Sequence, residues 1–497
     1  MTKNTTAPLP LSSADTTGAS AAIRMYCHGL GDCFLLRFTN SQDGKPYFVL
    51  IDCGVIGIAK NPRPLMEEVA SNIRDSCNGH LDLVILTHEH WDHVSGFSEQ
   101  QARSIFDQIQ IDQVWYAWTE DPSPKNKLGN KLRREREAKL RALQHATVAL
   151  QQQGNLAATE RAQRIQSLLS FFGDDANSSS GALAAADTGG IGKTRAAFDY
   201  LSKRSGVKVR YCHPKDSPVA IAGGAIRTYV LGPPENEALI KRSAPTKSGK
   251  ETYEMASQLM DAQIETAFER LAGRAERDDQ HSPFEASYRF ILPGDGFEPA
   301  PLLNLKAKIW DPVDWRKIDL DWTAVAESLA LNLDQHTNNT SLVIAFEIVA
   351  TKQVLLFAAD AQVGNWLSWQ DASWQTDSPH GQATNVTGPD LLSRTIFYKV
   401  GHHGSHNATL KELGLEQMTD KNLIAFVPVD KAQAETNRWL RIPFAPLMER
   451  LQEKTSGRVI RADETSLPKS LKGTAQTTHT LRQNSEHEPR FWELLIP

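Results

Sequence analysis

The sequence predicts an α/β fold, a four-layer αββα sandwich that large, mainly helical insertions interrupt. Two observations predict it. Short β-rich runs gather in two separate halves of the 497-residue chain, and segments with helical spacing accompany the strands in each half. Because a sheet with an apolar face must bury it, two such halves with their own helices favour two packed sheets covered by helices.

The composition is that of a folded globular protein, with 40% hydrophobic and 23% charged residues. The net charge of −5 excludes a global positive field that would attract nucleic acid or an anionic membrane. Five cysteines are an odd and sparse set, which favours free thiols in a reducing compartment. No run of about 18 apolar residues predicts a membrane span. We therefore expect a cytoplasmic protein that makes no membrane contact.

The first half of the predicted fold spans residues 22 to 118 and follows an N-terminal tail, residues 1 to 21, that is expected to be disordered. Glycines between its first three β-rich runs indicate an antiparallel meander. The predicted elements are strands at residues 23 to 27, 33 to 38 and 47 to 52, a helix around 65 to 73, a strand at 81 to 86, a helix at 98 to 109 and a strand at 113 to 118.

The rest of the chain alternates insertions with strands. We predict a helical and low-complexity insertion at 119 to 205, strands returning to the core at 206 to 232, a second insertion at 233 to 330, the second half of the fold at 331 to 465 and a C-terminal extension at 466 to 497. The later predicted strands are residues 207 to 212, 226 to 231, 340 to 349, 353 to 359, 395 to 400, 423 to 429 and 458 to 461, with a helix around 446 to 454.

A histidine-rich loop follows the predicted strand at 81 to 86. It contains His88, His90, Asp92 and His93 within six positions. In an extended loop the first three side chains lie on one side and His93 on the other, so the loop offers ligands to two neighbouring metal ions. Imidazole and carboxylate donors suit Zn, Mn or Fe. The loop therefore predicts a metal site.

This loop matches the His-x-His-x-Asp-His signature of the metallo-β-lactamase superfamily, and within it the chain most resembles the ComEC-like metallo-hydrolases. Four further passages are similar to that group and cover, with the loop, residues 22 to 104 and about 336 to 465. They are the Gly-x-Gly-Asp opening at Gly29 to Asp32, the turn at Asp52 to Gly54, the strand ending at Asp360, and the loop His402-His403-Gly404-Ser405.

The resemblance implies two divalent metal ions, zinc in first place with Mn or Fe as alternatives. It makes His88 and His90 ligands of one ion and Asp92 and His93 ligands of the other, with Asp360 as the bridging carboxylate. Asp92 or Asp360 would orient the attacking water, and both are our candidate catalytic residues. The family has Gly before this aspartate, whereas Ala359 stands here.

The resemblance leaves two ligands open. Either His402 or His403 completes the second ion, and we favour His402. The last ligand of the first ion is His336 or its competitor His213. Ser405 is expected to be a hydrogen-bonding loop residue, because a metal-activated water already serves as nucleophile in such sites.

Two more residues accompany the predicted site. The resemblance implies that Asp52 braces the histidine loop by accepting a hydrogen bond from a ligand imidazole or a loop amide. Lys399, near the same strand edge, is interpreted as a solvated side chain in preference to a substrate contact.

The leading function hypothesis is a dinuclear metal-dependent hydrolase, a phosphodiesterase or nuclease-like enzyme with a metal-activated water. Eight basic residues between Lys125 and Arg141 would contact nucleic acid. One alternative keeps the metals and hydrolyses another ester, a thioester or a lactone, since fold and ligands do not discriminate between these bonds. The other is a metal-binding interaction protein without catalysis, in which the insertions bind a protein partner.

Overall fold

The structure is a computed structural model that describes residues 19–57, 61–152, 156–173, 190–242, 321–377, 383–437, 439–466, 480–484 and 490–497. Residues 1 to 18 of the predicted tail (residues 1 to 21) and most of the second predicted insertion lie outside these residues. The chain divides into two compact units. Unit 1 holds residues 1–135, 170–258 and 334–497, and unit 2 holds residues 136–169 and 259–333.

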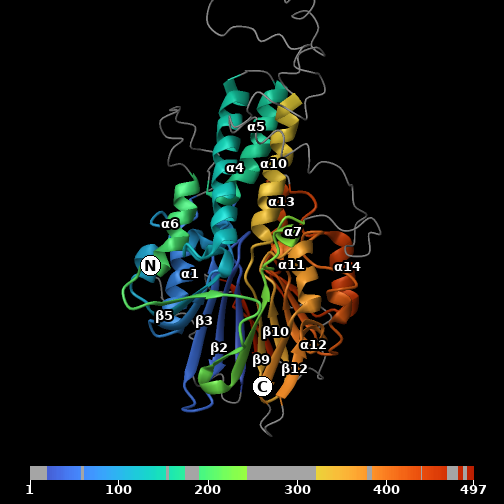
Figure 1. Cartoon of the computed structure of the whole chain (residues 1–497). Coiled ribbons are helices and arrows are strands. Elements are labelled where there is room, and N and C mark those ends of the chain that lie inside the picture. The colour runs from blue at the N-terminus through green and yellow to red at the C-terminus, as the bar shows by residue number, and fades with distance from the viewer. Residues whose placement is uncertain are drawn as a thin grey trace, which may run out of the picture. The chain divides into compact units, whose positions relative to one another are not determined.

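Unit 1 is a mixed α/β structure with two large mixed sheets (Figure 1). The first sheet has eight strands in the order β16-β17-β1-β2-β3-β4-β5-β6. The strands from β16 to β3 pair antiparallel, and those from β3 to β6 pair parallel. Their bounds are β1 Ala21–Tyr26, β2 Cys33–Thr39, β3 Pro46–Cys53, β4 His80–Ile85, β5 Gln110–Ala117, β6 Lys208–Cys212, β16 Thr480–Asn484 and β17 Phe491–Ile496.

The second sheet has seven strands in the order β15-β14-β13-β10-β9-β8-β7. The strands from β10 to β15 run parallel, and those from β7 to β10 antiparallel. Their bounds are β7 Val219–Ile221, β8 Ile226–Gly232, β9 Val343–Ile348, β10 Val354–Phe357, β13 Thr395–Lys399, β14 Ile424–Val427 and β15 Val459–Arg461, and a separate hairpin joins β11 Ser373–Asp377 to β12 Ala383–Thr387.

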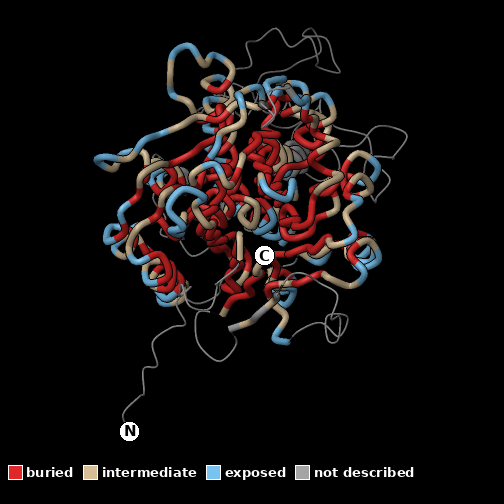
Figure 2. The backbone as a smooth tube through the Cα atoms, turned by 90° about the horizontal axis from the view of Figure 1, so that it is seen from below, coloured by how far each residue is buried: buried red, intermediate tan, exposed pale blue. Residues whose placement is uncertain are grey.

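One apolar core joins the two sheets. Phe34 of β2 meets Phe357 of β10 with ring centroids 5.6 Å apart, and Phe38 meets Phe346 of β9 at 5.7 Å. Figure 2 shows buried residues, in red, gathered toward the middle and exposed segments around them. Every second side chain of β1 and β2 lies in this core, because successive side chains on a strand point to opposite faces.

The other face of the first sheet is covered by helices. Met66, Val69 and Ile73 recur at helical spacing along α1 and pack into a second core with Leu35 and Leu50 of the sheet. Figure 1 shows α1 on the side of β2 and β3, and α11, α12 and α14 on the side of β9 and β10. The helices of unit 1 with their bounds are α1 Arg63–Ser76, α2 Trp91–Val94, α3 Arg103–Phe106, α6 Gly190–Ser202, α7 Glu237–Ile240, α11 Val363–Ser368, α12 Gly388–Ser393, α13 Lys431–Thr436 and α14 Ala445–Lys454.

The described part of unit 2 is helical. Helix α4 (Lys127–Gln152) enters it at Arg136, α5 (Leu156–Leu169) lies within it, and α10 (Asp321–Asn338) leaves it after Leu333. Apolar side chains are buried in it, among them Leu143 of α4 and Ile165 of α5. A helical insertion between the two predicted halves is therefore present.

Two predicted features differ from the structure. The helix predicted at 98 to 109 is reduced to α3, because residues 95 to 102 form short turns instead. The predicted C-terminal extension is not an appendage, since β17 pairs with β1 along its whole length. Arg24 of β1 and Glu493 of β17 form a buried ion pair at 2.9 Å, which anchors the last strand inside the sheet.

In the described parts of the chain, no helix combines the length and the apolar character that crossing a bilayer requires. All five cysteines lie among the described residues, and each is a buried free thiol.

Candidate metal centre

The residues of the predicted site meet at one edge of the two sheets. The histidine loop follows β4, Asp360 follows β10, and His402 and His403 follow β13. In each case a parallel strand ends just before the loop, and ligand sites of α/β proteins form where parallel strands present their carboxyl ends. The topology thus brings together segments that lie more than 240 positions apart in the sequence.

Asp52 holds the histidine loop in place. Its carboxylate accepts hydrogen bonds from the Thr87 amide at 2.9 Å and the Thr87 hydroxyl at 2.7 Å. The same carboxylate lies 2.8 Å from Nδ1 of His93. A partner on Nδ1 fixes the ring orientation and leaves Nε2 facing the site, which is how residues behind a metal ligand tune it.

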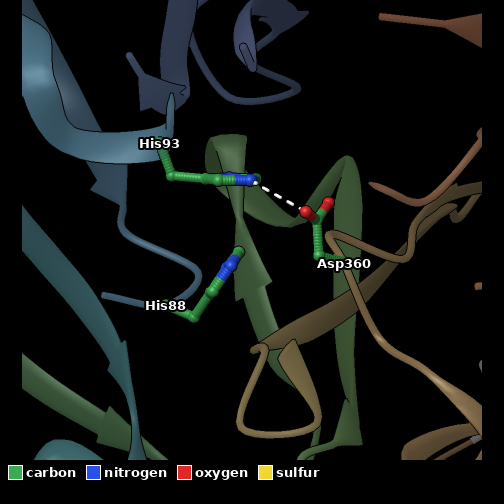
Figure 3. Close-up of side chains that lie close together, drawn as sticks. All are labelled: His88, His93 and Asp360. Atoms are coloured by element: carbon green, nitrogen blue, oxygen red, sulfur yellow. Dashed lines mark ion pairs between the residues drawn. The ribbon is translucent and has the colours of Figure 1, made fainter. Parts of the chain in front are cut away.

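Five side chains form two overlapping groups of potential ligands. His88, His93 and Asp360 offer donor atoms that all lie within 4.8 Å of one another. Asp92, Asp360 and His403 form a second group by the same measure. Figure 3 shows His88 and His93 pointing toward Asp360, whose Oδ2 lies 3.2 Å from Nε2 of His93. Asp360 belongs to both groups, which is the position that a carboxylate shared by two cations requires.

The structure brings His403, not the favoured His402, into a ligand group. His403 Nε2 lies 3.0 Å from Asp92 Oδ2, and its Nδ1 lies 2.6 Å from the Pro428 carbonyl oxygen. His402 instead donates its backbone amide to Asp360 Oδ1 at 2.9 Å, and its ring meets the Ser405 hydroxyl at 3.1 Å. Both histidines have positive φ, 45° and 52°, a strained conformation that clusters at functional sites.

Lys399 is buried, so its interpretation as a solvated side chain is wrong. Its ammonium forms ion pairs with Asp32 and with Asp360, the latter at 3.2 Å, and donates to the Ala359 carbonyl oxygen at 2.9 Å. The last position of β13 faces inward in the fold, and a buried lysine needs such anionic partners. Ala359 itself has φ of 48°, a conformation that favours glycine.

The buried charges set the protonation states of the histidines. Burial lowers the pKa of His90 to about 3 and that of His88 well below its usual range, so both imidazoles are neutral. Burial also opposes protonation of His93, but Asp360 and Asp92 raise its pKa well above the usual range. Burial would likewise raise the pKa of Asp360, yet His93 and Lys399 lower it strongly. The neutral imidazoles of His88 and His90 and the ionised carboxylate of Asp360 are therefore in the forms that bind cations, whereas His93 would have to release its proton to bind one.

Several buried side-chain nitrogen and oxygen atoms at this edge have no hydrogen-bond partner among the described residues. They are His90 Nε2, His93 Nε2, Asp92 Oδ1, Asp334 Oδ1 and Asp360 Oδ2. Such atoms are few in folded proteins, and a cluster of them indicates a missing partner. A deprotonated carboxylate oxygen or imidazole nitrogen has a lone pair but no proton to donate, and such atoms coordinate divalent cations. A divalent cation therefore fits this set of atoms.

Two predicted ligands lie apart from these groups. His213 is 2.8 Å from Glu235 and stacks on Trp118, with the ring centroids 6.0 Å apart. His336 lies half-buried on α10 and belongs to neither ligand group. The structure therefore places neither His213 nor His336 in a ligand group as the last ligand of the first ion.

Sequence reasoning missed the aromatic side chains beside the site. Phe172 packs edge-on against His90 with centroids 4.7 Å apart, and Phe171 stacks on Trp439 at 4.9 Å. Phe171 also approaches His402 at 6.3 Å. The segment Ser170–Phe172 follows α5 at the end of a helical stretch that the sequence indicates as an insertion, so no local signal linked its phenylalanines to the histidines.

The basic stretch between Lys125 and Arg141 carries less available charge than its sequence indicates. Lys131 pairs with Glu237 at 2.8 Å, and Arg141 approaches Glu137 at 3.8 Å. Arg133 donates to backbone oxygens, among them Asp121 at 2.8 Å. These contacts reduce the charge that could face phosphates.

The comparisons with family models and curated proteins do not identify the site. Neither the models of known protein families nor the curated proteins contain a match to this chain. The geometry of Asp360 and the surrounding histidines is therefore the basis for its function.

Proposed function

We propose that this chain is a metal-dependent hydrolase of the metallo-β-lactamase fold, similar to the ComEC-like group, that uses two divalent cations to cleave phosphodiesters. The observation that carries the proposal is the pair of ligand groups that share Asp360. The two mixed sheets, joined by one core and flanked by helices, support the four-layer αββα arrangement that this fold has.

The donors that would hold the cations are His88, His90, Asp92, His93, Asp360 and His403. When bound, divalent cations supply Lewis acidity toward an ester oxygen and make water a nucleophile at neutral pH. Zinc suits nitrogen and carboxylate donors of this kind, and Mn or Fe are the alternatives.

The protein's own contribution is orientation. Lys399 and the His402 amide both contact Oδ1 of Asp360 and leave Oδ2 toward His93. The Pro428 carbonyl oxygen fixes His403 in the same way as Asp52 fixes His93. Preorganised donors of this kind need little rearrangement during a reaction, which is the main source of catalytic advantage in polar sites.

Aromatic side chains pack beside the candidate ligands. Phe172 packs against His90, and Phe171 lies near His90 and His402 and stacks on Trp439. Both phenylalanines are buried, so they place apolar surface next to the donors and exclude water there.

The test is hydrolysis by the metal-loaded protein. We expect Zn- or Mn-dependent cleavage of bis(p-nitrophenyl) phosphate, which Asp360→Asn and His403→Ala abolish and the control His213→Ala retains. Plasmid DNA, single-stranded DNA and a lactone, assayed in parallel, distinguish the substrate classes. Cleavage of the lactone alone would contradict the phosphodiester assignment, and absence of any metal-dependent hydrolysis would overturn the function.

A further inference from the structure

Asp334 of α10 lies beside His90 in an arrangement that no contact within the chain explains. Its Oδ1 is 3.9 Å from Nε2 of His90, which is beyond hydrogen-bond distance. Both atoms are buried, and neither has a hydrogen-bond partner among the described residues. Burying a polar atom without a hydrogen-bond partner destabilises the fold, so a partner between the two atoms is expected.

Both side chains are held in these positions by other contacts. Asn338, one helical turn after Asp334, donates its Nδ2 to Asp334 Oδ2 at 3.2 Å and so leaves Oδ1 toward His90. Nδ1 of His90 meets His88 Nε2 at 3.0 Å, and Phe172 packs against the ring. These contacts therefore hold His90 Nε2 and Asp334 Oδ1 in positions where they face each other.

We propose that Asp334 is a protein ligand, together with His90, of one of the two divalent cations. The inference rests on the proposed function. Metal bonds to imidazole nitrogen and carboxylate oxygen are about 2.0–2.2 Å long, so one ion spans donors up to roughly 4 Å apart. The separation of 3.9 Å lies inside this span. A mixed nitrogen and oxygen donor set suits Zn, Mn or Fe.

The same placement excludes His336 from this role. An α-helix turns by about 100° per residue, so positions 334 and 336 point roughly 200° apart around the axis. Because Asp334 and Asn338 share the face toward His90, His336 lies on a different face. An aspartate thus takes the place for which the sequence indicated a histidine.

Metal content and affinity test the assignment without any activity assay. We would load the full chain with Zn²⁺, dialyse it, count the bound zinc by mass spectrometry and measure affinity by competition with a chromophoric chelator. We expect two equivalents for the wild type and for the matched control His336→Ala. Asp334→Asn should lose one equivalent or weaken one site at least about tenfold, the loss seen even for outer partners of a ligand.

The outcomes separate this assignment from the proposed function. Less than one equivalent in the wild type would overturn the proposed function, whereas two unchanged sites in Asp334→Asn would overturn only the ligand role and assign the gap to a water molecule. If Asp334→Asn fails to fold in the circular dichroism control, Asp334→Ala supplies the second variant. Loss of one equivalent in that folded variant supports ligation at this position, and two unchanged sites contradict it.

Discussion

Arg195 of α6 reaches Glu89 of the histidine loop, with Nη1 3.0 Å from Oε2. The same guanidinium nitrogen lies 2.8 Å from Oε2 of Glu120. Both carboxylates are buried, and Glu89 stands between His88 and His90. One arginine therefore links a helix from the predicted insertion to the loop that carries the candidate ligands.

Replacing this arginine should loosen the loop. Arg195→Ala removes the guanidinium that contacts two buried carboxylates. Loss of one partner from a buried ion pair typically costs about 3–5 kcal/mol. We expect a loss near 3 kcal/mol in urea unfolding, because Arg195 is partly exposed. Arg195→Lys keeps the positive charge but not the two-pronged guanidinium group. Its stability should therefore lie between that of the wild type and that of Arg195→Ala. An unchanged unfolding midpoint in Arg195→Ala would contradict the link.

The buried pair between Arg24 and Glu493 predicts a contrast between single and double replacement. Glu493→Ala leaves the Arg24 charge buried and should destabilise the protein by about 3–5 kcal/mol. The double variant Arg24→Met, Glu493→Leu removes both charges and keeps apolar volume, so it should lie much closer to the wild type. Thermal unfolding of the three proteins measures the difference. Equal losses in the single and double variants would be inconsistent with a paired role.

Chelation should lower the melting temperature. A cation that binds only the folded state stabilises it by about 2.7 kcal/mol at a hundredfold excess over its Kd. EDTA should therefore reduce Tm, and added Zn²⁺ should restore it. Asp360→Asn serves as the control, since loss of the shared carboxylate should remove most of the EDTA effect. If EDTA leaves the Tm of the wild type unchanged, the result would count against a bound cation.

The pair Glu416 and Arg450 predicts an acid-sensitive contribution to stability. Arg450 donates to both carboxylate oxygens, at 2.7 Å and 2.6 Å, and these hydrogen bonds lower the pKa of Glu416. A lowered pKa stabilises the fold above the unfolded value of about 4.3, and this stability is lost as the pH falls through the folded value. Glu416→Gln should lose less stability than the wild type between about pH 5 and pH 3.

The control for that comparison is Glu453→Gln, an exposed glutamate that also contacts Arg450, at 2.8 Å. Because its side chain is 68% exposed, the replacement should leave the acid limb of the unfolding curve nearly unchanged. A flat difference between wild type and Glu416→Gln across this pH range would refute the contribution.

The strands could be predicted because most are buried on both faces and form short apolar runs. Residues 226 to 231 and 395 to 400 were predicted as strands, and the structure has β8 at Ile226–Gly232 and β13 at Thr395–Lys399. The helix at 98 to 109 was wrong, because apolar spacing alone does not distinguish a helix from successive short turns over a buried surface.

The site could be predicted only as far as its donors lie in local motifs. The histidine loop, Asp360 and the paired histidines follow strands and carry short patterns. The choice of His403 over His402 depends on two successive residues with positive φ, which no spacing reveals. The place of Asp334 beside His90 depends on which face of α10 points inward. The burial of Lys399 depends on the carboxylates that surround it. Those are tertiary properties.

The pairing of β1 with β17 has a consequence for biosynthesis. Arg24 and Glu493 are 469 positions apart, so a ribosome that adds about 5–20 residues per second needs roughly 20 to 90 seconds between the two strands. During that interval one edge of β1 has no partner, and an open strand edge is a template for wrong pairing. We therefore expect this edge of the nascent chain to be open to wrong pairing until the closing strand is translated.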